Sequence, residues 1–346
     1  MEGLVGVGEW FDCLLIALGG RPKGWPLATS ISPVRFDRAG LLASCDSFQC
    51  PIDSQEGDVV KYCCFVSRGK QIKMTIANKT IREWVLYQEM TGHPSFSRAD
   101  VVAAFPVLSP HAVSNALVRL VRGGVIASVH KGFFVVIPTR YKMTGVVPPL
   151  FYMDALFRYL KRPYYASLLT AAKIWGASHQ MAQSEFVTTI KPAITTSKAK
   201  NPLLNWVYRS HVPEKLVCVR NGEGGVIRYS SAEFTLLDLV QYAHLVGGLS
   251  AVATVLADLT EAVDFTKCDT KVLFDAVKGR VVQRAGFILE DILGEKDCAD
   301  ALYEAYRATG TALLWTDLRP GAKDAPQGSN LRWKIKINEM VEPDET

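Results

Sequence analysis

Residues 109–124 read SPHAVSNALVRLVRGG, and this stretch decides the fold expected for the middle of the chain. Ser109 is a good helix N-cap and Pro110 suits the first helical position, whereas Gly123-Gly124 ends a helix. At about 100° per residue, two faces separate. The apolar face holds Val113, Ala116, Leu117, Leu120 and Val121. The opposite face holds His111, Ser114, Asn115, Val118, Arg119 and Arg122. The sequence therefore predicts a helix with a core face and a polar, cationic face without an acidic residue.

Such a polar face fits the major groove of DNA, because Arg can donate two hydrogen bonds to guanine and Asn can pair in the same way with adenine. Ser97-x-x-Asp100 resembles a capping box that opens a preceding short helix. Two apolar runs, 125–129 and 133–137, are joined by His130-Lys131-Gly132 and predict a β-hairpin whose tip offers Lys131 to a phosphate. Residues 74–142 are thus predicted to form a winged helix-turn-helix. A purely solvated helix face and a protein-docking module remain the alternatives.

Double-stranded DNA is the partner that this region implies, and the residues expected to contact it are few. They are Ser109, His111, Ser114, Asn115, Arg119, Arg122 and Lys131.

Charge is distributed unevenly along the 346 residues. Residues 74–142 carry 8 basic and 3 acidic side chains, and residues 143–228 carry 11 basic and 4 acidic ones. Residues 229–346 carry 12 basic and 19 acidic side chains, while residues 1–73 are neutral with 8 of each. A basic middle between a neutral leader and an acidic tail points to a polyanionic partner.

Composition excludes several classes of protein. The chain is 49% hydrophobic, which excludes a mostly disordered protein. No stretch of about 18 apolar residues exists to span a bilayer, and the first residues are acidic where a secretory signal is basic, so we expect a cytoplasmic protein without a membrane partner. The spacing from Cys45 to Cys64 does not match a zinc site, and no metal or cofactor is predicted.

The beginning of the chain, residues 1–73, lacks sustained periodicity. We interpret it as an extension that the protein does not need, produced by a start codon placed too far upstream.

Beyond a linker at residues 143–150, residues 151–346 read as a mixed α/β domain, which makes the whole chain α+β. Helices are expected at 153–161 and 164–174, and strands at 186–190, 203–209, 215–220 and 226–229. Ser230-x-x-Glu233 resembles a capping box that begins a largely helical section. A final alternating run at 331–337 predicts a strand.

Several motifs follow the predicted winged helix: YYASLLTAA at 164–172, GASHQ at 176–180, EFTLLDLV at 233–240, GGL at 247–249 and QRAGF at 283–287. In this order, they resemble one family, the AbiEi antitoxins, over roughly residues 74–340. The resemblance implies a winged helix that binds inverted repeats in its own promoter and represses its operon. It also implies a C-terminal domain that neutralises a nucleotidyltransferase-like toxin without a stable complex. An atypical serine kinase that phosphorylates the toxin, and a transcriptional regulator without a toxin, are the alternatives.

Candidate residues of the C-terminal domain come from these motifs, and they are His179, Gln180, Asp238, Gln283 and Arg284. The chain has no phosphate-binding loop and no protein-kinase signature, so no catalytic residue is assigned and an enzyme is not expected. Asp238 lies in an apolar helix, where a carboxylate is costly unless it is paired. We expect an ion pair with Arg284; if the kinase interpretation held, Asp238 and Arg284 would be its first candidates.

Overall fold

The computed structural model describes residues 80–177, 184–194, 203–321 and 325–343. All of these residues belong to one compact unit. The proposed extension at residues 1–73, the cysteines within it, and the candidates His179 and Gln180 lie outside the described residues. Within the described part, no helix has both the length and the apolar character needed to cross a membrane.

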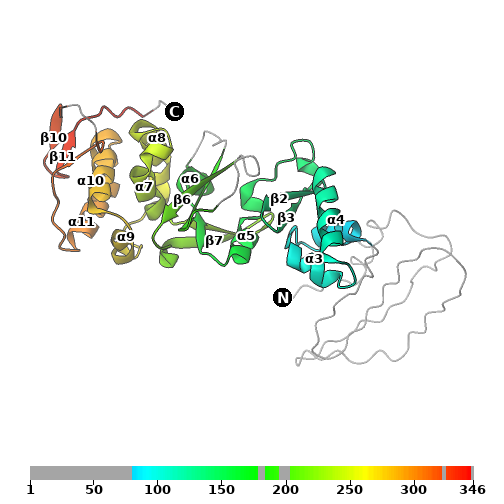
Figure 1. Cartoon of the computed structure of the whole chain (residues 1–346). Helices are drawn as coiled ribbons and strands as arrows, with labels where there is room; N and C mark the ends of the chain where they lie inside the picture. Colours follow the sequence, from blue (N-terminus) through cyan, green and yellow to red (C-terminus); the bar gives the residue numbers. More distant parts are fainter. Residues whose placement is uncertain (1–79, 178–183, 195–202, 322–324, 344–346) are drawn as a thin grey trace, which may run out of the picture. The chain divides into compact units, whose positions relative to one another are not determined.

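The first described section alternates helices with the strands of a small antiparallel sheet (Figure 1). Its elements are α2 (Ile81–Met90), β1 (Ser95–Ser97), α3 (Arg98–Ala104), α4 (Pro110–Arg122), β2 (Ile126–His130) and β3 (Phe133–Val136). The strands lie in the order β1-β3-β2. β2 and β3 form the expected hairpin, and Gly132 at its tip has a φ of +75°, a conformation that glycine adopts without strain.

Local signals in the sequence set the ends of these helices. Ser97 and Asp100 form the predicted capping box of α3, and the Ser109 hydroxyl caps α4 by accepting from the Ala112 N–H at 3.2 Å. α2 begins after Thr80, which forms a capping box with Glu83. The apolar face of α4 packs into a core with α2, β1 and β3, in which Val113, Leu117 and Leu120 are buried.

The opposite face of the hairpin packs against the next helix, α5 (Met153–Leu160), in a second apolar cluster. Val129, Phe133 and Val135 of the hairpin join Met153, Leu156 and Phe157 of α5 there. At the tip, the Tyr159 hydroxyl donates to the Lys131 carbonyl oxygen at 3.2 Å. The hairpin therefore contributes to two cores at once.

The centre of the chain forms a mixed sheet in the order β6-β5-β4-β8-β7. The strands are β4 (Tyr164–Ala166), β5 (Glu185–Ile190), β6 (Leu204–Arg209), β7 (Val217–Gly222) and β8 (Gly225–Ser230). β5 and β6 are parallel, as are β4 and β8, whereas β4 with β5 and β7 with β8 are antiparallel.

The helix predicted over 164–174 is wrong in its first turn. Tyr164, Tyr165 and Ala166 form the buried strand β4, which pairs with β5 on one side and β8 on the other. Helix α6 (Leu168–Trp175) begins only after Ser167. The pairing on both sides, which no local pattern reveals, outweighs the helical spacing of the apolar residues.

Helices dominate the C-terminal section (Figure 1), and several of them pack against α7. They are α7 (Ala232–Gln241), α8 (Leu249–Leu259), α9 (Thr270–Ala276), α10 (Gly279–Phe287), which continues as a π-helix (Ile288–Ile292), and α11 (Lys296–Arg307). The cap of α7 is Ser231, one residue later than predicted, and its hydroxyl accepts from the Phe234 N–H. Glu233 instead accepts from the Asp264 N–H at 3.0 Å.

A small sheet follows, in the order β10-β11-β9. Its strands are β9 (Thr316–Asp317), β10 (Gly328–Asn330) and β11 (Ile335–Ile337). The strand predicted over 331–337 is wrong in its first half, because residues 331–334 form a turn in which Lys334 has a φ of 55°. This turn buries Trp333 against Gly286 of α10, where a Cβ atom would lie 2.2 Å from the indole ring.

Candidate functional sites

The outer face of α4 is exposed, as its helical spacing predicts. His111, Asn115, Arg119 and Arg122 are exposed, and Ser114 is half-buried. Within the described residues, no hydrogen bond or ion pair holds the side chains of Asn115, Arg119 and Arg122. These three side chains are available to a partner that offers acceptors.

Two of the candidate hydroxyl groups on α4 already have structural roles. The Ser109 hydroxyl caps the helix, and the Ser114 hydroxyl donates to the Pro110 carbonyl oxygen at 2.8 Å. Each hydroxyl oxygen keeps further capacity for a hydrogen bond, but neither side chain is free to turn without breaking a bond inside the helix.

A groove with a volume of about 1080 Å³ lies between α3, α4 and the hairpin. Val102, Val118 and Phe134 are among the apolar residues that line it, and Lys131 and Arg122 are among the basic ones. Lys131 is exposed at the hairpin tip, next to the carbonyl oxygen that Tyr159 holds. The structure thus brings the cation of the hairpin tip to the same groove as the last turn of α4.

Asp238 occupies the centre of a buried polar cluster in the C-terminal domain. Its side chain has no solvent exposure and forms an ion pair with Arg209, whose side chain is 7% exposed. The Tyr165 hydroxyl donates to the other Asp238 oxygen at 3.0 Å, and Arg209 also donates to the Ala276 carbonyl oxygen. The expected pairing with Arg284 is therefore wrong: the partner comes from the end of β6, 29 residues before Asp238.

Burial controls the protonation of this cluster. It raises the pKa of the Asp238 carboxyl, while the charge of Arg209 and the hydroxyl of Tyr165 oppose that rise. Burial and the neighbouring carboxylate raise the pKa of Tyr165 well above its usual value, so this phenol stays a hydrogen-bond donor. The Asp238 side chain is closed to solvent, and its bonds with Arg209 and Tyr165 link α7 to β6 and β4.

Gln283 and Arg284 are adjacent on α10 but differ in their contacts. The Gln283 amide nitrogen donates to the carbonyl oxygens of Leu314 and Trp333, both at 2.7 Å, and this buried side chain fixes two loops. Arg284 is half-buried and donates from Nε to the Asp317 carbonyl oxygen at 2.9 Å and from Nη2 to the Thr316 hydroxyl at 3.2 Å.

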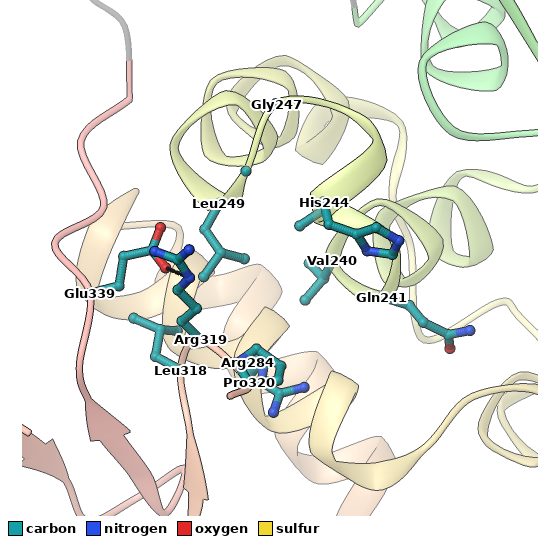
Figure 2. Close-up of a pocket in the computed structure, with 12 residues that line it drawn as sticks. Val240, Gln241, His244, Gly247, Leu249, Arg284, Leu318, Arg319, Pro320 and Glu339 are labelled. Carbon is teal, nitrogen blue, oxygen red and sulfur yellow. Dashed lines mark ion pairs between the residues drawn. The ribbon is translucent and has the colours of Figure 1, made fainter. Parts of the chain in front are cut away.

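Arg284 also lines a pocket of about 560 Å³ between α7, α8, α10 and the C-terminal segment. Figure 2 shows Arg319 and Glu339 facing each other on one side of this pocket, and Gln241 and His244 on the other side. Gly247, Gly248 and Leu249, which precede and open α8, complete the lining together with Val240, Ala243, Leu318 and Pro320. Two motifs far apart in the sequence, at 247–249 and 283–287, thus meet at one pocket.

Sequence reasoning missed Arg209 and Arg319. Arg209 ends a predicted strand and Arg319 lies in the segment between β9 and β10. Neither belongs to a motif, and an isolated arginine carries no signal for the partner it will meet.

The fold and the pocket define a mixed α+β protein whose C-terminal half is organised around α7. Comparison with known proteins gives the family of that half: residues 165–291 match the AbiEi antitoxin C-terminal domain. This match, over 127 of the 346 residues, confirms the resemblance to AbiEi antitoxins in this part of the chain. A crystal structure of the RV2827C protein from Mycobacterium tuberculosis is similar in fold, with a TM-score of 0.54 and 13% sequence identity over 73% of this chain and 89% of that chain. No curated protein matches the chain.

Proposed function

We propose that this protein is an antitoxin that binds double-stranded DNA through the winged helix-turn-helix expected at residues 74–142 and represses its own operon, while its C-terminal domain neutralises a nucleotidyltransferase-like toxin. The observation that carries the first half is the outer face of α4, which is exposed, cationic and free of acidic residues. The match to the antitoxin domain carries the second half, because antitoxins act on a toxin.

The order of elements supports a winged helix-turn-helix. Two helices, α3 and α4, are joined by a short turn and followed by the β2–β3 hairpin, the arrangement in which the second helix enters the major groove. α4 presents Asn115, Arg119 and Arg122 on its free face. Asn and Arg are the side chains that read adenine and guanine by paired hydrogen bonds.

The groove beside α4 supports contacts with the DNA backbone. Arg98, Arg122 and Lys131 are its basic side chains, and their charge suits phosphates. The Arg98 guanidinium also donates to the Pro110 carbonyl oxygen at 3.1 Å, so this cation is held at the start of α4. We assign Lys131 and Arg98 to phosphate contacts and Asn115 and Arg119 to base contacts, with His111 and Ser114 at the edge of the same face.

The kinase alternative has little support from these side chains. Asp238 is enclosed and bonded to Arg209 and Tyr165, so it cannot hold a nucleotide or accept a proton from a substrate. Of the two residues that this alternative first offered, Arg284 alone lines a pocket. We therefore propose neutralisation without phosphorylation. The resemblance to AbiEi antitoxins further implies that no stable complex with the toxin is required.

DNA binding is tested by fluorescence anisotropy with a labelled duplex that contains the inverted repeats upstream of the gene. We expect the full chain to bind this duplex more tightly than a scrambled one, and the Asn115→Ala/Arg119→Ala double variant to lose that preference. Because both side chains are exposed, the variant should unfold at the wild-type temperature. Equal binding of the two duplexes by the wild-type protein would refute sequence-specific repression.

Neutralisation is tested by co-expression with the neighbouring toxin gene, with growth as the measurement. The wild-type chain and the double variant should both restore growth, because α4 is not part of the antitoxin domain. Deleting residues 74–142 is a poor alternative, since it would expose the apolar residues of α5 that the hairpin covers. Failure of the wild-type chain to rescue growth would leave a DNA-binding regulator without that partner. Incubation of the toxin with this protein and ATP, followed by mass spectrometry, tests phosphorylation.

A further inference from the structure

The pocket at Arg284 has an excess of positive charge. Arg284 and Arg319 line it, and Glu339 is the single carboxylate among its lining residues. Arg319 and Glu339 form an ion pair with a separation of 3.5 Å between Nε and Oε2, at the long end of such contacts. Arg319 therefore has an ion-pair partner, whereas no ion pair is formed by Arg284 within the described residues.

Arg284 has no carboxylate partner among the described residues. Its two hydrogen bonds go to a neutral carbonyl and a neutral hydroxyl, which fix the direction of the guanidinium without neutralising its charge. Three of its five N–H groups remain without an acceptor in the described part of the chain. Burial lowers the pKa of this guanidinium and the nearby charge of Arg280 lowers it further, whereas the Asp317 carboxylate, which forms no ion pair with it, partly opposes this shift. An anion in the pocket would therefore still improve the environment of Arg284.

The start of α8 adds backbone donors on the same pocket. Gly248 is the N-cap of α8 and, lacking a side chain, gives no hydrogen bond to the first turn. The first N–H groups of a helix have no partner within it, and the positive end of the helix dipole lies there. Gly247 and Gly248 have φ values of 103° and 96°, which glycine adopts without strain. Because neither residue has a Cβ atom, their backbone is open to the pocket that they line.

From the cavity, the absence of an ion pair at Arg284 within the described residues and the diglycine turn, we propose that this pocket binds a small molecule that carries a phosphate group. The phosphate oxygens would accept from Arg284 and from the first turn of α8, and Glu339 would oppose them by its charge. Val240, Leu249, Leu318 and Pro320 give the pocket an apolar side, which suits a phosphate ester with an organic part more than a bare ion. The volume of about 560 Å³ is within the range of small-molecule sites.

The experiment is isothermal titration calorimetry of the full chain with ATP, pyrophosphate and citrate, at low and high salt, without DNA or toxin. We expect ATP and pyrophosphate to bind and citrate to bind more weakly or not at all. Tighter binding of ATP than of pyrophosphate would show that the apolar side takes part. Absence of binding by both phosphate probes, or stronger binding of citrate, overturns the proposal.

Variants with opposite expected effects locate the site. Arg284→Gln should weaken phosphate binding by about tenfold or more, since hydrogen bonds to a charged group are lost. Glu339→Gln should strengthen it several-fold, because the opposing charge is removed while the shape is kept. Arg220→Gln, an exposed position on β7 outside the pocket, is the matched control and should bind as the wild type does.

Arg284→Gln also loses two hydrogen bonds, so its fold must be checked by its unfolding temperature without ligand. If that variant does not fold, Glu339→Gln still decides, because a phosphate bound elsewhere would not respond to it. Unchanged affinity in Glu339→Gln together with unchanged affinity in a folded Arg284→Gln refutes the site. Because no DNA or toxin takes part, this outcome is independent of the proposed repression and neutralisation.

Discussion

The arginines of α4 and those of the C-terminal domain differ in what surrounds them. Arg119 and Arg122 on α4 are exposed and have no acidic neighbour within bonding distance in the described residues. By contrast, Arg209, Arg228 and Arg332 each form ion pairs, with Asp238, with Glu214, and with Glu290 and Asp300 respectively. The same residue type is left without an ion pair in one region, where a partner could use it, and holds the domain together in the other.

This difference teaches that net charge alone does not locate a nucleic-acid surface. Residues 143–228 have a larger basic excess than residues 74–142, yet several of their arginines are already paired: Arg158 with Asp154, Arg209 with Asp238 and Arg228 with Glu214. A paired arginine gives up an existing interaction before it binds phosphate. Residues 74–142 have the smaller excess, but the arginines of α4 within them have no such cost, and α4 is therefore the better candidate for DNA.

The largest effect is expected from a substitution that breaks the buried ion pair between Arg209 and Asp238. Asp238→Asn leaves the Arg209 charge enclosed without its counter-ion, and removing one partner of such a pair costs about 3–5 kcal/mol in the free energy of unfolding. Urea unfolding of the full chain, followed by circular dichroism, measures it. Asp300→Asn is the control, because the Asp300 side chain is 59% exposed and exposed pairs contribute about 0–1 kcal/mol. Equal losses in both variants would contradict a special role for the buried pair.

An intermediate effect is expected on α4. Arg119→Ala should weaken binding to the operator by about 1–3 kcal/mol and relax the preference for one base pair. The free energy of unfolding should stay within about 0.5 kcal/mol, as for exposed positions without partners. Arg82→Ala, at an exposed position of α2, serves as the control for the loss of one charge. A loss with Arg82→Ala as large as that with Arg119→Ala would reduce α4 to non-specific attraction.

The smallest effect concerns the hairpin tip. Lys131→Ala should weaken binding to specific and scrambled duplexes alike and reduce the slope of log affinity against log salt by about 1. Anisotropy titrations at several salt concentrations measure this slope. Because the Tyr159 hydroxyl bonds to the Lys131 backbone and not to its side chain, the hairpin should keep its position. An unchanged slope would mean that Lys131 makes no phosphate contact, and the proposed DNA surface would then be reduced to the groove and the α4 face without the hairpin tip.

Sequence patterns predicted the elements whose signals are local. α4 has a capping serine, a proline at its first position and glycines at its end, so both its limits and its faces were predictable. β1 was not, because three residues are too few to show a period and the strand exists only through its pairing with β3. The prediction for β4 was wrong for the same reason: this strand is also three residues long, and it exists through its pairing with β5 on one side and β8 on the other.

The buried cluster was half predictable. The apolar residues around Asp238 required a cationic partner, and the sequence offered several. Only the packing of β6 against α7 selects Arg209, a choice that depends on the whole sheet. The pocket that Gly247 and Arg284 both line was not predictable either. It depends on how the start of α8 packs near α10, which no local sequence pattern encodes.

The contact between Tyr159 and the hairpin tip has a consequence for recognition. A wing that is free in solution must lose conformational freedom when it meets DNA, and that loss opposes binding. Here the tip already rests on α5 through the Tyr159 hydroxyl, and Phe133 and Val135 fix the strands below it. The backbone of this loop is held without DNA, so in the proposed complex Lys131 would approach the phosphates from a position that is already fixed. Because the β2–β3 hairpin packs on α5, a shift of this helix would also change the position of the hairpin tip.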